Sequence, residues 1–166
     1  MVGRLGEPVV RLAVRQAMRI MGHQFVMGRT IDEALARANK GASAGSRQSF
    51  DMLGEGALTM TDARRYLQAY HDAIQAIGAH HRRAQPGPDR AGVPAAEAVL
   101  AAPGISIKLS ALFPRYEHAK RERVLAELAP VLLDLAQAAR AQGIGLTIDA
   151  EESERLELSL DLVQAT

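Results

Sequence analysis

Cysteine and tryptophan are absent from this chain of 166 residues, and aromatic side chains make up only 4 % of it. Without cysteine, the chain can form no disulfide framework, no thiolate nucleophile and no Cys-ligated zinc site. With so few aromatic side chains, its core must be built from Leu, Ile, Val, Ala and Met. Hydrophobic residues still make up 48 % of the chain, which is typical of a folded globular protein.

An excess of charge of either sign is also lacking. The 20 Lys and Arg residues balance the 19 Asp and Glu residues, so this segment is not expected to bind nucleic acid by general electrostatics. No apolar run approaches the ~18 residues of a membrane span. Arg4, Glu7, Arg11 and Arg15 interrupt the region where a signal peptide would be apolar. We therefore expect a cytoplasmic protein.

Two helices are predicted in the first quarter of the chain. Apolar residues recur at helical spacing over 8–22, with Pro8 where a helix start tolerates it and Gly22 as a stop signal. Thr30 precedes Glu33 by three residues, which is the spacing of a capping box. The predicted helices cover 8–22 and 30–39, and the Gly- and Ser-rich segment 41–46 follows them.

Strands and helices are predicted to alternate after residue 46. The predicted strands are 47–53, 105–109 and 144–149, and the predicted helices are 61–80, 96–102, 117–142 and 151–166. Pro130 is expected to kink or restart the third of these helices near Ala129. The proline-rich residues 82–95 are expected to form an exposed loop or insertion.

This alternation is typical of an α/β protein with parallel strands. Either a (β/α) barrel or a doubly wound sheet would produce it. Because a barrel needs roughly eight strands, three strands could form only part of one. The second and third strands are expected to be apolar on both faces, as in a buried parallel sheet.

Charged residues stand at or just beyond the end of each predicted strand. They are Asp51 and then Glu55 for the first strand, Lys108 for the second, and Asp149, Glu151 and Glu152 for the third. Because the carboxyl ends of parallel strands form the functional rim of β/α folds, we expect Asp51, Lys108 and Asp149 to surround one mouth. The structural alternative is that each residue caps the helix that follows it.

Lys108 is the most informative of these residues, because it interrupts the apolar run of the second strand. A partly buried lysine needs a carboxylate partner, and Asp149 on the neighbouring strand is the expected one. The side chain could act as a Schiff-base nucleophile or as a cation that holds a substrate carboxylate. The adjacent His80 and His81 are expected to be solvated, and no metal site is predicted.

Three long motifs resemble the proline dehydrogenase domain of the bifunctional bacterial proline utilization A proteins. The motifs are SFDMLGEGALT at 49–59, PGISIKLSALFPRY at 103–116 and GIGLTIDAEESERLELSLDL at 143–162. The helical residues 6–38 resemble the segment that precedes that domain's barrel. The resemblance covers nearly the whole chain except 82–96, which looks like an insertion.

The resemblance implies a distorted (β/α)₈ barrel that holds FAD. Residues 1–45 would be a helical lead, and residues 46–166 would be the N-terminal part of the proline dehydrogenase barrel. Three β/α units form an incomplete barrel, and most flavin contacts of the family lie further along its chains. A fragment of this kind is expected to bind no FAD tightly and to be inactive alone, and it is expected to be poorly stable or to associate with itself.

The implied reaction is the oxidation of L-proline to Δ1-pyrroline-5-carboxylate, in proline catabolism toward glutamate. Hydride passes to flavin N5, and electrons leave to membrane ubiquinone, so the complete protein would lie in the cytoplasm or peripherally at the inner membrane. Lys108 resembles the lysine that pairs with the proline carboxylate, and Asp149 resembles its acidic partner. Glu55 resembles a glutamate that pairs with a substrate-binding arginine and helps gate the site, and Asp51 resembles an aspartate that lines it.

Two other functions remain open from the residues alone. A lysine Schiff-base aldolase on a similar barrel would use Lys108 as its nucleophile. A helical interaction module with an incomplete sheet would have no enzymatic activity.

Overall fold

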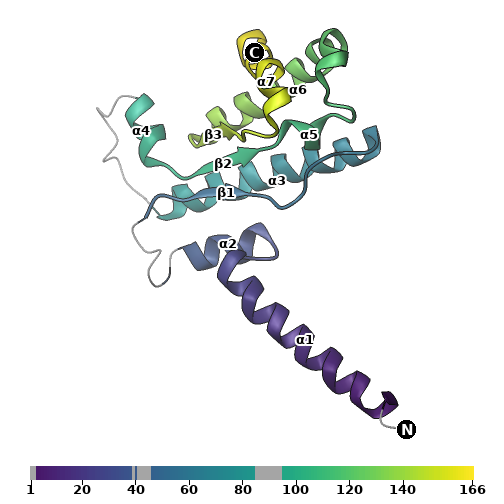
Figure 1. Cartoon of the computed structure of the whole chain (residues 1–166). Helices are drawn as coiled ribbons and strands as arrows, with labels where there is room; N and C mark the ends of the chain where they lie inside the picture. The colour runs from purple at the N-terminus through teal and green to yellow at the C-terminus, as the bar shows by residue number, and fades with distance from the viewer. Residues whose placement is uncertain (1–2, 39, 41–45, 85–94) are drawn as a thin grey trace. The chain divides into compact units, whose positions relative to one another are not determined.

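The computed structural model describes residues 3–38, 40, 46–84 and 95–166. The chain divides into two compact units, one that ends at Ser46 and one that begins at Arg47. The first unit contains helices, and the second combines helices with a small parallel sheet (Figure 1).

The first unit contains helices α1 (Gly3–Phe25) and α2 (Ile31–Ala38). The prediction that Pro8 and Gly22 bound the first helix is wrong, because α1 passes through both residues. A glycine inside a helix costs about 1 kcal/mol relative to alanine, and the good helix formers around Gly22 offset that cost.

The predicted capping box is present at the start of α2 in a modified form. The backbone N–H of Glu33 donates to Thr30 Oγ1 over 3.2 Å. The Glu33 carboxylate accepts the backbone N–H of Arg29 at 2.8 Å, one residue earlier than in the standard box. Both bonds satisfy backbone donors that would otherwise lack partners near the helix start. The predicted end of this helix at residue 39 lies outside the described residues.

The sheet of the second unit has three parallel strands in the order β1-β2-β3. The strands are β1 (Ser49–Asp51), β2 (Gly104–Ile107) and β3 (Gly145–Ile148). Phe50 pairs with Ile105, and Ile105 with Leu146. The next row of the register joins Asp51, Ser106 and Thr147.

Helices follow each strand, as the alternation predicted. They are α3 (Met60–Ala84), α4 (Ala95–Ala101), α5 (Leu109–Leu112), α6 (Arg121–Gln142) and α7 (Leu156–Ala165), with short 3₁₀ turns at His118–Lys120 and Ser153–Arg155. Helix α3 packs against α6 and β2, and α6 also packs against β3 and α7. The final helix is confirmed despite the alternating leucines of its sequence.

The core lies between one face of the sheet and the helices. Ile105 and Ile107 of β2 are fully buried, as are Ile74 and Ile77 of α3. From α6, the apolar stripe Val124, Leu128, Leu132, Leu135 and Ala139 joins this core. Because side chains alternate along a strand, the single residue between the two isoleucines lies on the opposite face, together with the residues that pair with it on β1 and β3.

That opposite face is polar, which corrects the expectation that the strands are apolar on both faces. We call it the polar face; its central row is Asp51, Ser106 and Thr147. Ser106 is nevertheless buried. Its hydroxyl group still has a hydrogen-bond partner, so its burial leaves no unsatisfied polar group. The polar face therefore has the composition of a site rather than of a second core.

Three further features differ from the predictions. Strand β2 ends at Ile107, so Lys108 and Leu109 lie outside it, and the short helix α5 begins at Leu109 with all four of its residues buried. Helix α3 continues to Ala84, so the predicted loop over 82–95 begins too early; residues 85–94 lie outside the described residues. Helix α6 does not restart near Ala129, because its apolar stripe continues through Pro130 at helical spacing.

Candidate active site

Three charged residues converge where the three strands end. Asp51 is the last residue of β1, and Lys108 and Asp149 each come one residue after β2 and β3. Lys108 has extended backbone angles (φ −105°, ψ 123°), so it keeps the alternation of β2 and shares the face of Ser106. Asp149 is held in line by its backbone N–H, which donates to the Ile107 carbonyl at 2.9 Å.

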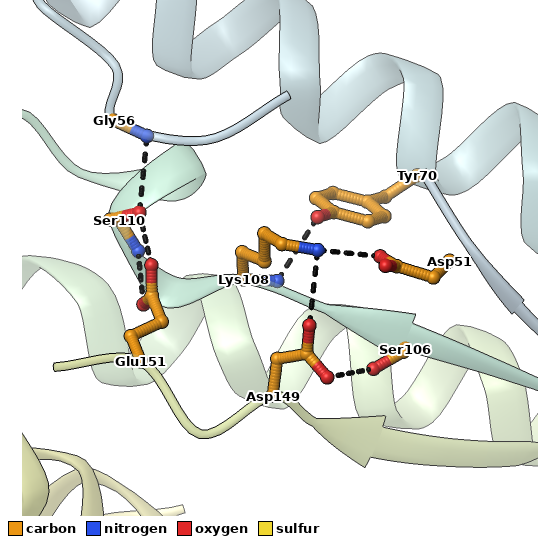
Figure 2. Close-up of polar contacts among 8 residues, drawn as sticks. All are labelled: Asp51, Gly56, Tyr70, Ser106, Lys108, Ser110, Asp149 and Glu151. Carbon is orange, nitrogen blue, oxygen red and sulfur yellow. Dashed lines mark hydrogen bonds and ion pairs between the residues drawn. The ribbon is translucent and has the colours of Figure 1, made fainter. Parts of the chain in front are cut away.

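The lysine lies between the two carboxylates (Figure 2). Lys108 Nζ is 2.6 Å from Asp51 Oδ1 and 3.0 Å from Asp149 Oδ2. The Lys108 side chain is 13 % exposed, whereas those of Asp51 and Asp149 are 48 % and 36 % exposed. We call these three residues the rim triad. The predicted pairing of Lys108 with Asp149 is confirmed, and Asp51 is a second partner.

The rim triad keeps its lysine charged. Burial opposes the charge on Lys108, but hydrogen bonds to Asp51 and Asp149 outweigh it, so the pKa of Lys108 is raised above its ordinary value. The pKa of Asp149 is lowered, first because Ser106 donates a hydrogen bond and then because Lys108 lies beside it; burial opposes both effects. The triad therefore carries one positive and two negative charges at neutral pH.

Two uncharged residues support the rim triad. Ser106 Oγ donates to Asp149 Oδ1 over 2.7 Å, which leaves the other carboxylate oxygen for Lys108. The hydroxyl of Tyr70, from α3, accepts the backbone N–H of Lys108 at 3.0 Å. Burial raises the pKa of Tyr70, although the hydrogen bond from Lys108 partly opposes this. Tyr70 thus replaces the strand partner that the Lys108 N–H loses where β2 ends.

A second polar network lies beside the rim triad. The Glu151 carboxylate accepts both the backbone N–H and the hydroxyl of Ser110, at the start of α5. Ser110 in turn accepts the backbone N–H of Gly56 at its Oγ (3.1 Å) and that of Ala57 at its carbonyl (2.9 Å). We call Glu151, Ser110, Gly56 and Ala57 the Glu151 clamp; Figure 2 shows Glu151, Ser110 and the Gly56 N–H.

Glu55 does not join either network. It is exposed on the loop between β1 and α3, and among the described residues its side chain makes no hydrogen bond or ion pair. Sequence reasoning missed Tyr70, which helical spacing assigns to the core, and the serines Ser106 and Ser110. Ser106 could have been found from its spacing, because it lies two residues before Lys108 on the same side of an extended segment. The same spacing does not identify Ser110, because Ser110 lies in helix α5.

The whole chain was compared with known proteins. Residues 34–166 match the family described as "Proline dehydrogenase". The chain belongs to the proline dehydrogenase family. It is therefore related to oxidoreductases, and its motifs, its strand-end charges and the family match agree with one another.

The curated relatives that match it are bifunctional proteins. The bifunctional protein PutA of Escherichia coli K12 is 51 % identical over 163 residues, which cover 98 % of this chain and 11 % of the relative. The bifunctional protein PutA of Rhizobium meliloti is 46 % identical over 164 residues, covering 99 % of this chain and 12 % of the relative. This chain thus spans little more than a tenth of the length of these relatives.

Solved structures show the same fold. A crystal structure of a bifunctional proline utilization A (PutA) protein has a TM-score of 0.71 and 52 % identity, covering 99 % of this chain and 16 % of that one. A PutA variant from Bradyrhizobium japonicum gives 0.70 and 52 %, covering 99 % and 15 %. The PutA of Bdellovibrio bacteriovorus has a TM-score of 0.72 at 21 % identity, covering 91 % and 16 %, and supports the fold alone.

None of the helices in the described parts of the chain is long and apolar enough to span a bilayer. Within residues 3–38, 40, 46–84 and 95–166, no group of three or more His, Asp or Glu side chains is arranged to hold a metal ion.

Proposed function

We propose that this chain supplies part of the substrate site of a flavin-dependent proline dehydrogenase, which oxidises L-proline to Δ1-pyrroline-5-carboxylate. In this proposal the three strands are the first strands of a distorted (β/α)₈ barrel, and the polar face lines its interior. The observation that carries the proposal is the rim triad, a partly buried lysine between two carboxylates in a chain of the proline dehydrogenase family.

The hydrogen bonds of Lys108 support a role in binding a carboxylate. An ammonium group has three N–H donors. Two of them reach Asp51 and Asp149, and among the described residues the third has no acceptor. A substrate carboxylate can take that donor.

Proline fits the charge of the triad because it is a zwitterion. Its carboxylate would approach Lys108, while its ammonium group would be attracted to the partly exposed carboxylates. An anion without a positive group would instead be repelled by the two aspartates. Asp149 and Asp51 are therefore proposed to hold the lysine in place and to favour a zwitterionic substrate.

FAD is proposed as the cofactor of the complete domain on family resemblance. The described residues at the strand ends do not fit its diphosphate, because the two carboxylates of the rim triad outnumber its one lysine and would repel the phosphate groups. Transfer of electrons to membrane ubiquinone, with a cytoplasmic or peripheral membrane location, belongs to the same proposal.

Glu55 is proposed to pair with a substrate-binding arginine and to help gate the site. Its exposed side chain, without an ion-pair partner among the described residues, leaves it available for this contact. The arrangement disfavours the aldolase alternative, because a Schiff-base lysine must lose its proton, and the carboxylates raise the pKa of Lys108.

The test is a chimera of the Escherichia coli bifunctional protein PutA in which this chain replaces the matching segment. We expect the purified chimera to show flavin absorbance and to reduce a dye in the presence of proline. The 166-residue chain alone is expected to do neither. A folded, flavin-loaded chimera that does not respond to proline would contradict the proposed function, and trapping of Lys108 by borohydride with a substrate would favour the aldolase.

A further inference from the structure

The Glu151 clamp joins the segments that follow all three strands. Glu151 comes two residues after Asp149, and Ser110 comes two residues after Lys108. The third segment is the loop 52–59, which connects β1 to α3 and carries Glu55. The clamp thus joins the three segments that lead away from the members of the rim triad.

The hydrogen bonds of Ser110 make it the central residue of the clamp. Its backbone N–H and hydroxyl donate to Glu151, and its hydroxyl oxygen and carbonyl accept from Gly56 and Ala57. Ser110 is 4 % exposed, so water cannot readily replace a lost partner. The position of Ser110 therefore depends on the Glu151 carboxylate.

Apart from the hydrogen bonds between Thr59 and Asp62 at its C-terminal end, the loop 52–59 has few other attachments. Leu53 and Leu58 are 79 % and 88 % exposed, so their side chains contribute little packing. Ala57 is the one buried residue of the loop. The two backbone bonds to Ser110 hold the loop at the residues directly after Glu55.

We propose that Glu151 is a positioning residue, which acts through Ser110 to fix the loop 52–59 and thereby the position of Glu55. The expected effect of Glu151 on proline oxidation rests on the proposed function, whereas the tethering of the loop rests on the hydrogen bonds alone. Glu151 contacts no member of the rim triad, so its effect on proline oxidation passes through the loop.

The tether is tested by amide hydrogen exchange, resolved by residue, in the full chain. Glu151→Ala is expected to speed exchange at Gly56 and Ala57 at least about tenfold, because both bonds depend on a fixed Ser110. Ser110→Ala removes the hydroxyl, so it should speed exchange at Gly56 far more than at Ala57. Glu154→Ala is the matched control, since Glu154 is exposed on the same segment and contacts no part of the loop.

Amides of α6 report whether a variant has lost the whole fold. If Glu151→Ala unfolds the chain, Glu151→Gln replaces it, because the amide keeps the size and one acceptor; a smaller increase at the same two residues is expected. Equal exchange at Gly56 and Ala57 in the Glu151 and Glu154 variants overturns the proposal.

The kinetic consequence is tested in the chimera with a double-mutant cycle. If Glu151 acts through Glu55, Glu151→Ala and Glu55→Gln each raise KM for proline, and the double variant is no worse than Glu55→Gln alone. Additive losses overturn the positioning role. A chimera without any proline oxidation instead contradicts the proposed function, and the exchange result then decides the tether by itself.

Discussion

At the scale of single residues, we propose that Lys108 has both a structural and a chemical role in the rim triad. Its ammonium group reduces the repulsion between two carboxylates, and its third N–H donor is proposed to bind a ligand. The two roles can be separated, because a structural ion pair affects stability and a substrate contact affects turnover.

We expect Lys108→Met in the chimera to lower proline turnover far more than stability. Loss of a charged hydrogen bond to substrate in a partly dehydrated site costs about 2–4 kcal/mol, or roughly 30- to 1000-fold in kcat/KM. The methionine stem keeps most of the packing of the lysine. The measurement is kcat/KM for proline per bound flavin, beside the melting temperature. Unchanged flavin-normalised efficiency with a lower melting temperature would make Lys108 a structural residue.

Tyr70→Phe removes one oxygen atom and leaves the buried N–H of Lys108 without an acceptor. We expect a loss of about 1–3 kcal/mol in the free energy of unfolding, together with a lower kcat/KM in the chimera. Tyr116→Phe is the matched control: Tyr116 is also buried, but its partner Ser159 keeps a second bond to the Arg155 carbonyl. Urea unfolding of both variants tests this, and equal losses would contradict the role of Tyr70.

Asp149 makes the free energy of unfolding depend on pH in the acid range. A carboxylate whose folded pKa is lowered stabilises the fold above its unfolded pKa, and this stability is lost as pH falls below the ordinary value of 3.8 toward the folded value. We therefore expect Asp149→Asn to weaken the pH dependence of the unfolding free energy between about pH 2 and pH 6. An Asp149→Asn variant whose unfolding free energy keeps the same slope against pH as the unsubstituted chain would refute the argument.

At the scale of elements, the sequence predicted the order of strands and helices and the meeting of charges at the strand ends. Alternation of patterns carries that information, because each strand must be followed by a helix that covers it. The end of β2 was missed because Leu109 continues the apolar pattern while the backbone already turns into α5. Tyr70 was missed because its ring packs in the core, whereas its hydroxyl group bonds the backbone of Lys108. Helical spacing predicts the packing of the ring but not the hydrogen bond of the hydroxyl group.

The loop between β1 and α3 depends on Gly54 more than on Gly56. Gly54 has φ +131°, and a Cβ there would lie 2.7 Å from Tyr66 Cε1; Gly56 has φ +63°, and a Cβ there would meet open space. We expect Gly56→Ala to cost about 1 kcal/mol of stability and Gly54→Ala on the order of 1–3 kcal/mol more. Chemical denaturation of both variants measures the difference, and a Gly54→Ala variant no less stable than Gly56→Ala would contradict it.

At the scale of the whole molecule, the sheet is bordered by strands that pair on one side. In the part of the chain that the structure describes, β1 and β3 each have one neighbouring strand, so each presents an edge. The polar face affects which surface of the sheet can drive association of the chain. Its row of Asp51, Ser106 and Thr147 gives little apolar area to cover, so the hydrogen-bonding edges supply the stronger tendency to associate.

We expect the 166-residue chain to associate through its sheet edges at micromolar concentrations. A lysine on an edge strand discourages pairing with another chain, so Thr147→Lys, at an exposed position of β3, should shift the chain toward monomer. Gln137→Lys makes a closely matched change on the exposed surface of α6, away from the strand edges, and should leave association unchanged. Sedimentation velocity over a range of concentrations distinguishes these outcomes. Equal effects of the two lysines would mean that net charge, rather than the strand edge, governs association; a chain that stays monomeric without either change would show that these edges are already protected.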